Sequence, residues 1–338
     1  MKKQKLPFII FETTSVCNLN CKYCYNIWKR PGEVDEPKNS YRKARRALKR
    51  LFRLADVEQV TFTGGEPLIS ERFQELVLFT RLRKKYVSII TNGNGGKKED
   101  YHMLIRLGCE LFELPIHSNI PENHDNLSQI KGSWEKSVQS VKDILSLGGN
   151  VVCVIVITKI NYKEIKETLK FIRSIGVNRV MLNRYNIGGT GLSYINELVT
   201  TKEELNEAFR LANEAAEETG MKLSSNVCTP ICLVDFKQYP KIAWAPCSSN
   251  VLNKPITLDI EGNIRMCNHS PIVLGNIFKE NFETIFKSEY LKGWTDIVPE
   301  FCNGCDLFDK CFGGCRAASE QMGFTLHEVD PVLTCLKK

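Results

Sequence analysis

The sequence has no apolar stretch of the roughly 18 residues that a membrane-spanning helix requires. Its basic N-terminus, Met1 to Lys5, is followed only by a short apolar stretch from Leu6 to Phe11, which Pro7 interrupts. A secretory signal needs a longer apolar region and a small-residue cleavage site. We therefore expect a cytoplasmic protein that neither crosses nor enters a membrane.

The composition also lacks the bias of a disordered chain, because hydrophobic residues make up 43% and charged residues 25%. At 338 residues the chain suits a large barrel, or a catalytic domain with an appended module. No aromatic-rich platform or nucleic-acid-binding motif accompanies the net charge of +7, so nucleic acid is not an expected partner.

Much of the positive charge lies in one segment, where seven lysine or arginine residues occur between Arg42 and Arg53 on an expected helix. The simpler interpretation of such a run is a solvated helix face. The alternative is a docking surface for an acidic partner, such as a flavodoxin or an acidic peptide.

Strand-like and helix-like patterns alternate from residue 6 to about residue 225. The expected strands lie at 6–12, 58–63, 86–91, 109–116, 151–157 and 178–183, and the expected helices at 40–54, 71–83, 98–107, 133–147, 162–174 and 201–219. Six βα units imply an α/β fold with a parallel sheet. Such sheets place their chemistry in the loops that follow the carboxyl ends of the strands.

After residue 225 the periodic pattern fades, turns appear at 261–263 and 312–314, and nine of the fourteen cysteines occur. A region this poor in periodic apolar segments needs covalent or metal staples to hold it together. We place a domain boundary near residue 226, between a catalytic unit (1–225) and a cysteine-rich, mostly irregular unit (226–338).

Fourteen cysteines without an export signal favour metal or cluster ligation, because the cytosol keeps thiols reduced. Cys109 and Cys153 lie in apolar, strand-like segments and are interpreted as ordinary buried residues. The first cluster of cysteines, Cys17, Cys21 and Cys24, forms a C-x3-C-x2-C loop directly after the first strand. Three thiolates from one loop can hold three corners of a cubane and leave one iron open. A structural zinc site would need a fourth ligand, and no further Cys or His lies nearby.

This spacing, with Asn18-Leu19 inside it and Tyr23 before the third cysteine, resembles the radical S-adenosylmethionine (SAM) superfamily. The resemblance implies a partial (β/α)6 barrel and a [4Fe-4S] cluster on the three cysteines, with SAM chelated to the open iron. It further implies that an electron from a flavodoxin or ferredoxin cleaves SAM to methionine and a 5′-deoxyadenosyl radical, which abstracts hydrogen from the substrate.

A second motif agrees with this interpretation, because Gly64-Gly65-Glu66-Pro67 follows the second strand and resembles the family's GGEP segment. In that family the segment is implied to bind the methionine amino group of SAM. Two glycines allow a ligand to approach the backbone closely, and a carboxylate can accept from an ammonium group. Without the preceding strand the same residues would indicate merely a turn.

Three further residues follow strands and are weaker candidates. Asn92 lies in a Thr-Asn-Gly turn that the family often has after the third strand, and Ser118 follows the fourth strand, where the resemblance implies contacts near the SAM ribose. Arg184 follows the sixth strand and could pair with a carboxylate of SAM or substrate. Plain turns or caps explain each position equally well. The predicted SAM-binding residues are thus Tyr23, Gly64, Gly65, Glu66, Pro67, Asn92, Ser118 and Arg184.

The C-terminal cysteines follow the pattern C-x(9–15)-G-x4-C, a gap, C-x2-C-x5-C-x3-C, and a final cysteine, which resembles a SPASM module. The seven positions are Cys247, Cys267, Cys302, Cys305, Cys311, Cys315 and Cys335. The resemblance implies two auxiliary [4Fe-4S] clusters and hence three clusters in all. It assigns Cys302, Cys305, Cys311 and Cys335 to one auxiliary cluster, and Cys247, Cys267 and Cys315 to the other.

The second of these sets lacks a fourth ligand. Cys232 and Cys228 are both candidates to complete it, and an open iron that binds substrate is a third possibility. The competing interpretation of the whole region is a zinc ribbon, although that would leave several cysteines surplus.

Enzymes of the resembled type mostly modify peptides or proteins, so we expect side-chain or backbone modification of a peptide, for example crosslink formation in a ribosomally made peptide. The alternatives are oxidation of the sulfatase-maturase kind and oxidation or decarboxylation of a small molecule such as a haem precursor. A non-catalytic iron-sulfur or zinc scaffold would be a different class.

The substrate and its handling are only sketched by the sequence. The first strand begins by residue 6, so we expect a leader peptide to be bound by a separate protein or by another surface, such as 40–54. Tyr25, Asn26, Trp28 and Tyr185 fit a substrate cavity and a packed core equally well.

Overall fold

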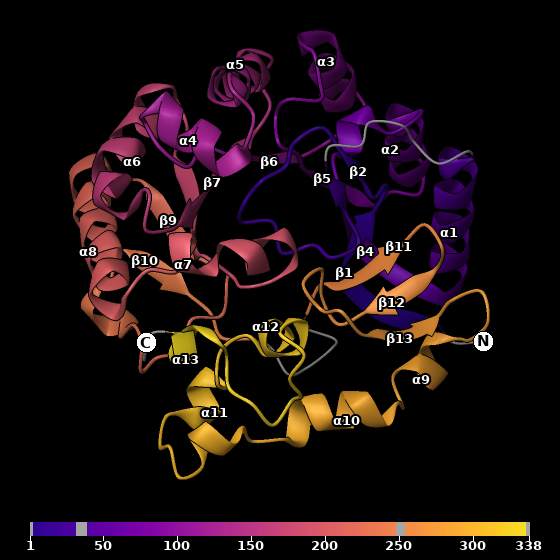
Figure 1. Ribbon diagram of the computed structural model, residues 1–338. Helices are drawn as coiled ribbons and strands as arrows, with labels where there is room; N and C mark the ends of the chain where they lie inside the picture. Colours follow the sequence, from indigo (N-terminus) through magenta and orange to yellow (C-terminus); the bar gives the residue numbers. More distant parts are fainter. Residues whose placement is uncertain (1–2, 32–38, 248–253, 336–338) are drawn as a thin grey trace.

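The computed structural model describes residues 3–31, 39–247 and 254–335 of the chain. Strands and helices alternate up to residue 225 and form an open ring, with the strands inside and the helices outside (Figure 1). The strands of the main sheet are β1 (Gln4–Glu12), β4 (Ala55–Thr63), β5 (Tyr86–Ile90), β6 (Leu111–Pro115), β7 (Val151–Ile157), β8 (Arg179–Arg184), β9 (Lys222–Ser225), β10 (Ile242–Trp244), β11 (Ile256–Asp259), β12 (Asn263–Arg265) and β13 (Val273–Asn276). A separate pair is formed by β2 (Val16–Cys17) and β3 (Arg30–Pro31).

The helices divide into two sets. Those of the ring are α1 (Ser40–Leu54), α2 (Phe73–Arg81), α3 (Lys98–Arg106), α4 (Pro121–Ser128), α5 (Ser133–Ser146), α6 (Ile165–Ser174), α7 (Ile195–Leu198) and α8 (Lys202–Thr219). Those of the C-terminal region are α9 (Phe282–Ile285), α10 (Glu289–Asp296), α11 (Phe308–Cys311), α12 (Arg316–Gln321) and α13 (Val332–Cys335). Short 3-10 helices are η1 (Pro67–Ile69), η2 (Tyr162–Glu164), η3 (Gly189–Tyr194), η4 (Phe236–Gln238) and η5 (Glu300–Cys302).

The main sheet has the strand order β10-β9-β8-β7-β6-β5-β4-β1-β11-β12-β13. Neighbours from β10 to β11 are parallel, whereas β12 is antiparallel to both of its neighbours, β11 and β13. Ile9 of β1 pairs with Val60 of β4 on one side and with Ile256 of β11 on the other. The C-terminal region is therefore joined to the first strand of the ring by backbone hydrogen bonds.

The outer helices cover the sheet because each carries an apolar stripe at helical spacing. On α1 the stripe includes Ala44, Leu48 and Leu51, all fully buried, and burying each large apolar side chain contributes about 1.5–3 kcal/mol. At the start of α8 the Thr201 side chain accepts from the Glu204 backbone N–H at 3.2 Å, and Gly220 ends the helix in the left-handed region.

The structure confirms the six predicted strands and six predicted helices, with ends that differ by no more than a few residues, and it confirms the α/β fold class. It adds α4 and α7, which lie between the predicted elements, and the strands β9 to β13. These five strands have three or four residues each, which is too short for a periodic pattern to reveal them.

The C-terminal helices of four to eight residues lie along one side of the ring, across the gap between β10 and β13 (Figure 1). Because β10 to β13 belong to the same sheet as β1 and β4 to β9, the two predicted units share one sheet, and the boundary at residue 226 stays a prediction. Within the described ranges, no helix combines the length and the apolar character that crossing a bilayer would need.

Candidate active site

A cavity of about 610 Å³ lies at the carboxyl ends of the ring strands, where a parallel sheet is expected to place its chemistry. Cys17, Cys21 and Cys24 line one part of it. A second set of cysteines lines another part and consists of Cys228, Cys247, Cys267 and Cys315. The cavity therefore extends between two groups of thiols that are far apart in the sequence.

The loop that carries the first group is fixed by its backbone. Thr14 O accepts from Gly65 N at 2.8 Å, and Val16 O accepts from Glu66 N at 2.8 Å, so the loop lies directly against the Gly64–Pro67 segment. On its other side, the Lys22 N–H donates to Leu127 O of α4 at 2.9 Å. The Lys22 ammonium also forms an ion pair with Glu197.

Gly65 is required by this close packing of backbones. A Cβ atom there would overlap the carbonyl group of Val16 and lie 3.0 Å from the Cys17 nitrogen. Gly64 has φ +143°, in the region that favours glycine, and a Cβ atom there would lie 2.4 Å from the Thr14 carbonyl oxygen. Both glycines line the cavity, which agrees with a backbone role for this motif.

Glu66 is fully buried, and its carboxylate turns away from the cavity lining toward the protein. It accepts hydrogen bonds from Thr91 Oγ1 and Asn92 N, both at 2.7 Å, and from Leu68 N at 3.0 Å. Burial raises the pKa of Glu66, and these three donors oppose the rise. The carboxylate thus ties the end of β4 to the end of β5, while a direct contact with SAM stays a prediction.

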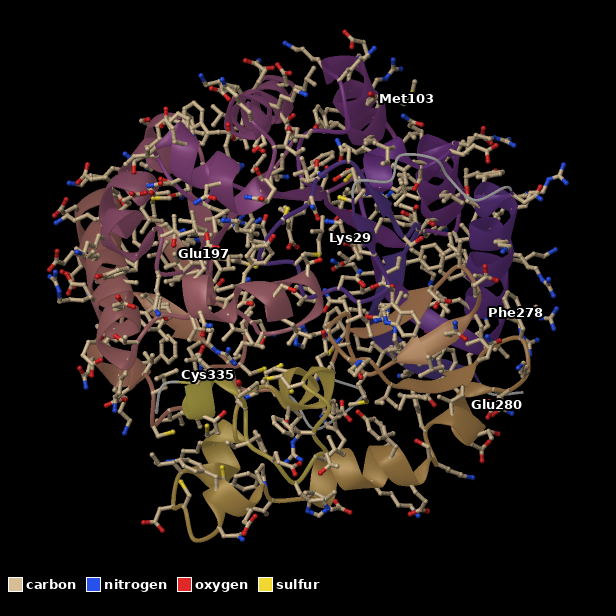
Figure 2. All side chains as sticks on the ribbon, in the orientation of Figure 1. Lys29, Met103, Glu197, Phe278, Glu280 and Cys335 are labelled. Atoms are coloured by element: carbon tan, nitrogen blue, oxygen red, sulfur yellow. The ribbon has the colours of Figure 1, made fainter. Side chains whose placement is uncertain are left out.

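Asn92 and Tyr23, two further predicted SAM contacts, also lie in the cavity lining. Asn92 Nδ2 donates to Asn18 Oδ1 at 2.8 Å and to Cys17 Sγ at 3.7 Å, so this side chain braces the cysteine loop. Tyr23 packs edge-on against the His117 ring, with centroids 4.5 Å apart. Lys29, which sequence reasoning did not single out, also lines the cavity and points into the middle of the ring (Figure 2).

Ser118 does not belong to this lining, because its hydroxyl donates to Glu164 and accepts from Ile120 N. Its neighbour His117 lines the cavity instead. His117 Nδ1 accepts from Val156 N at 3.2 Å, so the neutral ring carries its proton on Nε2, and burial lowers the pKa of this histidine well below its ordinary value. That Nε2 is buried without a hydrogen-bond partner among the described residues.

Arg184 lines the cavity, but its charge is already matched within the protein. It forms a buried ion pair with Asp330, and it donates to the backbone oxygen of Cys228 at 2.8 Å. Asp330 in turn accepts from Cys315 N at 2.6 Å. In the structure Arg184 pairs with Asp330, and this pair fixes Cys228 and Cys315 at the second end of the cavity. The expected pairing of Arg184 with a carboxylate of SAM or substrate stays a prediction.

At that second end the structure brings Cys228, rather than Cys232, to Cys247. The Cys228 thiol donates to Cys247, and together with the ammonium of Lys254 it holds the pKa of Cys247 below its ordinary range. Lys254 Nζ lies 2.8 Å from Cys247 Sγ and 4.7 Å from the centre of the Trp294 ring. On the cavity side, Asn186 donates to Cys315 Sγ at 3.5 Å.

A third group of cysteines lies outside the cavity lining and consists of Cys232, Cys302, Cys305 and Cys311. The pKa of Cys302 is raised to about 11, first by burial and then by the neighbouring Cys311, Cys305 and Cys232. Cys335 packs instead against the buried cluster that contains Tyr185 and Leu198. In the described part of the chain, no three His, Cys, Asp or Glu side chains are arranged to hold a single metal ion.

The remaining sequence expectations concern four candidate cavity residues and two cysteines that were interpreted as buried. Tyr25 and Asn26 line the cavity, whereas Tyr185 is packed in a buried cluster and Trp28 is exposed. Cys109 and Cys153 are buried in the main core, as predicted, and burial raises the pKa of each thiol.

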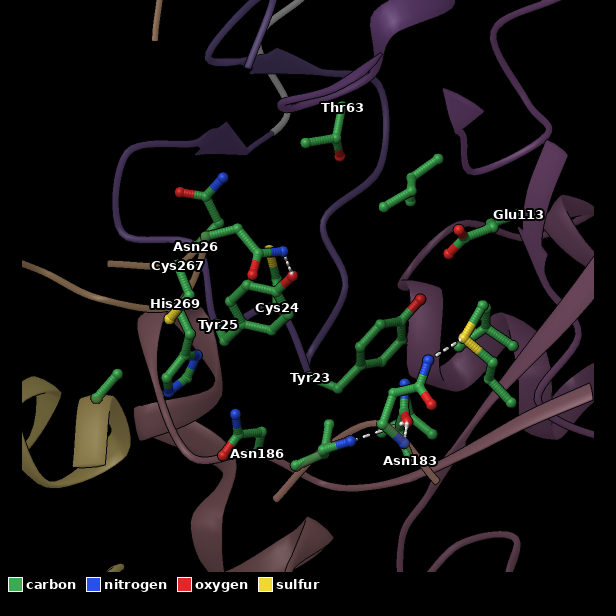
Figure 3. A pocket seen from close by; sticks show the side chains of 18 of the residues that line it. Tyr23, Cys24, Tyr25, Asn26, Thr63, Glu113, Asn183, Asn186, Cys267 and His269 are labelled. Carbon is green, nitrogen blue, oxygen red and sulfur yellow. Dashed lines mark hydrogen bonds between the residues drawn. The ribbon is translucent and has the colours of Figure 1, made fainter. Parts of the chain in front are cut away.

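Glu113 is the carboxylate that sequence reasoning missed. It lies on β6, faces the cavity (Figure 3), and forms no hydrogen bond or ion pair through its side chain with any described residue. The other carboxylate in the lining, Glu12, is paired with Arg265. Burial raises the pKa of Glu113 to about 7, so this group can exchange a proton near neutral pH.

Replacing Glu113 by glutamine should stabilise the protein at high pH. The unfolded chain loses this proton near its ordinary pKa of 4.5 and the folded chain near 7, so stability falls as pH rises between these values and is constant above. The cost reaches roughly 3 kcal/mol at pH 8. Thermal unfolding of the reconstituted protein should show a higher midpoint for Glu113→Gln, with a difference that shrinks toward pH 5. Glu58→Gln, an exposed change on β4, is the control, and equal midpoints at pH 8 would contradict this account.

Comparisons with known proteins agree with this arrangement. The model of the Radical SAM superfamily matches residues 11–172. A PqqA peptide cyclase of Gluconobacter oxydans is 25% identical over 333 residues, which cover 96% of this chain and 89% of that protein. A PqqA peptide cyclase of Xanthomonas campestris pv. campestris is 22% identical over 331 residues, covering 96% and 85%.

Two solved structures share the fold. Streptococcus suis SuiB bound to S-adenosylmethionine has a TM-score of 0.73 at 18% identity, covering 97% of this chain and 77% of that one. The structure of anSMEcpe with bound AdoMet has a TM-score of 0.73 at 17% identity, covering 98% and 95%.

Proposed function

Because the chain is a radical SAM enzyme with a C-terminal SPASM domain, we propose that it modifies a peptide, by forming a crosslink, in the cavity between its two groups of cysteines. One observation supports this most strongly: the cavity is lined at one place by Cys17, Cys21 and Cys24 and at another by a second, separate set of four thiols. The first position is suited to starting a radical reaction, and the second to ending it.

The residues of the first position fit a [4Fe-4S] cluster with an open iron. Three thiols converge on the cavity from one loop, and Asn92 donates toward Cys17 Sγ, as hydrogen-bond donors commonly do to cluster ligands. Bound there, the cluster and SAM supply a 5′-deoxyadenosyl radical that removes a hydrogen atom from the substrate. The backbone of Gly64 and Gly65, together with Tyr23, lies at the same part of the lining and would hold SAM.

The second position fits a cluster with four cysteine ligands, Cys228, Cys247, Cys267 and Cys315. With all four irons ligated by protein, such a cluster accepts electrons rather than binding substrate. The buried ammonium of Lys254, 2.8 Å from Cys247 Sγ, would offset the negative charge of thiolates and cluster. These ligands, and the total of three clusters, are part of the proposal.

A crosslink removes two hydrogens from the peptide, so its balance needs three acceptors. With the clusters and SAM bound, the 5′-deoxyadenosyl group would take one hydrogen atom, the auxiliary cluster would take one electron, and a base of the protein would take one proton. Glu113 is suited to the third task, because its carboxylate faces the cavity without a salt bridge and its pKa is raised to about 7 by burial.

The peptide substrate is inferred from the relatives. The PqqA peptide cyclases are named for a peptide substrate, and SuiB has been solved with its precursor peptide SuiA. We propose a flavodoxin or ferredoxin as reductant and a cytoplasmic location. A separate leader-binding protein is a further proposal.

The basic face of α1 is one place where such a partner could dock. Several of its charges already contact residues that flank β12 and β13. Lys43 pairs with Glu261, Arg46 lies over the Phe278 ring, and Arg50 donates to Ile277 O. Arg42 and Lys49 are exposed and belong to the part of the face that could still bind an acidic surface.

The proposal is tested with the anaerobically reconstituted enzyme and a short peptide encoded next to its gene. We expect about twelve irons per chain, 5′-deoxyadenosine on addition of dithionite, and a peptide product lighter by two hydrogens. Fragmentation of that product distinguishes a crosslink from side-chain oxidation of the sulfatase-maturase kind. Bound zinc without iron, or iron without SAM cleavage, would contradict the proposal.

A further inference from the structure

We propose that Cys232 is the fourth ligand of the second auxiliary cluster, in the place that the family pattern gives to Cys335. This inference rests on the proposed function, since it assumes that Cys302, Cys305 and Cys311 hold an iron-sulfur cluster.

The three cysteines are already held together by their own loop. Cys305 N donates to Cys302 O at 3.1 Å, which makes a tight turn between the first two. The short helix α11 then carries Cys311, whose N–H donates to Leu307 O at 3.0 Å. After α11 the chain turns back at Gly313, where a Cβ atom would lie 3.4 Å from Cys302 Sγ. The loop thus closes on itself around one group of thiols.

The segment that carries Cys232 packs onto this loop. The N–H of Ile231 donates to Cys311 Sγ at 3.3 Å, so Cys232 is one residue away from a direct contact with a cysteine of the group. Pro230 lies against Gly314, where a Cβ atom would be 2.8 Å from the proline ring. The two residues after Cys232, Leu233 and Val234, are buried in the main core and anchor the segment.

The backbone of Cys232 is fixed, whereas its side chain is exposed beside the group. Its carbonyl oxygen accepts from Lys202 Nζ at 3.0 Å. After burial, the nearby Cys311 and Cys305 raise the pKa of the Cys232 thiol. Cys232 is in turn one of the cysteines that raise the pKa of Cys302. Four thiols from two segments therefore lie near one another, and four is the ligand number that a closed [4Fe-4S] cluster requires.

Cys335 is held at a different place. It is the last residue of α13, a helix that follows Asp330, and Asp330 is committed to Arg184 and to the Cys315 backbone. Val332 of the same helix is buried in the main core, and Cys335 itself packs beside Tyr185. Figure 2 shows Cys335 on α13, with the α11 region at the lower edge of the molecule. Bringing Cys335 to the group would require α13 to leave these contacts.

A site completed by Cys232 would have a functional consequence. Cys232 and Cys305 are both exposed, so this cluster would lie at the surface, outside the substrate cavity. Burial lowers the pKa of Arg316, and the charges of Cys247 and Cys302 both oppose this change. Arg316 therefore lies between the two auxiliary groups. Such an arrangement would let electrons that arrive at the cavity leave the enzyme through a fully ligated, solvent-facing cluster.

Alkylation of the reconstituted full chain tests the assignment without any mutation. Iodoacetamide is added under anaerobic conditions, and modified cysteines are identified by mass spectrometry before and after the iron is removed with a chelator. We expect Cys232 to be protected while iron is bound and to react once it is removed, because a ligating thiolate is not available as a nucleophile. Rapid alkylation of Cys232 in the iron-loaded protein, with Cys335 protected, would overturn the proposal.

A pair of variants provides the second readout. Cys232→Ser should lose about four irons, or show a [3Fe-4S] signal by electron paramagnetic resonance, whereas Cys335→Ser should match the wild-type iron content. Cys109→Ala controls for the loss of a cysteine outside every group, and circular dichroism checks that each variant is folded. The opposite pattern, with iron lost only in Cys335→Ser, would refute the role of Cys232. A wild-type content of about eight irons would instead show that the second auxiliary cluster itself is absent.

Discussion

Replacing Cys24 by alanine is expected to reduce 5′-deoxyadenosine formation to the background of the assay. The cluster that binds SAM would keep only Cys17 and Cys21 as ligands, and no other cysteine lies in this part of the cavity lining to take the vacant place. A cubane held by two thiolates is not retained, so the iron content should also fall by about four per chain. Iron analysis and chromatography of the reaction with dithionite measure both effects.

The matched variant is Cys305→Ala, which removes one thiol from the group outside the cavity. We expect this protein still to cleave SAM, because its first cluster is unchanged, but to lose the modified peptide, because the electron released by the substrate has no exit. The comparison separates starting the radical reaction from completing it. If Cys24→Ala cleaved SAM as fast as Cys305→Ala, the assignment of the SAM-binding cluster to the first loop would be wrong.

The sequence was informative about this first loop because cluster chemistry restricts residue type and spacing together. Three thiolates must come from a few neighbouring residues, and the glycines of the second motif must lie where backbones meet. Both requirements produce short contiguous motifs that can be recognised in the sequence. The structure places Cys17, Cys21 and Cys24 in the same cavity lining as Gly64 and Gly65.

Side-chain direction was not accessible in the same way. Ser118 and His117 both follow β6, yet only His117 lines the cavity, because α4 begins at Pro121 and turns Ser118 toward Glu164. Periodicity did not reveal α4, which has only eight residues. Glu113 was missed for a related reason: its environment, not its position in a motif, gives it a raised pKa.

Contacts between residues far apart in the sequence determine where Cys228 and Cys232 lie. Sequence spacing could not distinguish Cys228 from Cys232 as the fourth ligand of the Cys247, Cys267 and Cys315 set, because the two are only four residues apart. The structure separates them, because Arg184 holds the backbone of Cys228 beside the cavity, while Ile231 holds the next segment against Cys311. Neither contact joins residues that are close in the sequence, so no local pattern could have shown it.

Replacing Gly65 by alanine is expected to abolish SAM cleavage although the change removes no ligand. The new Cβ atom would overlap the backbone carbonyl of Val16, which cannot rotate away as a flexible side chain could. The two segments must then separate, and the hydrogen bonds from Gly65 N to Thr14 O and from Glu66 N to Val16 O are lost or strained. Each such bond contributes about 0.5–1.5 kcal/mol, and the overlap adds to this, so a total loss above roughly 4 kcal/mol is expected.

The displacement acts directly on the cluster ligands, because Cys17 follows Val16 and pairs with Asn92 through its sulfur. Loss of about four irons should therefore accompany the loss of 5′-deoxyadenosine, while the auxiliary groups, which lie on other segments, keep their iron. Gly293→Ala is the matched control, because Gly293 lies within α10 and alanine favours a helix. Its new Cβ would approach only side-chain atoms, of Ile297 at 3.2 Å and of Leu326 at 3.5 Å. A Gly65→Ala enzyme with the iron content and SAM cleavage of Gly293→Ala would show that these two loops need not touch for the cluster to form.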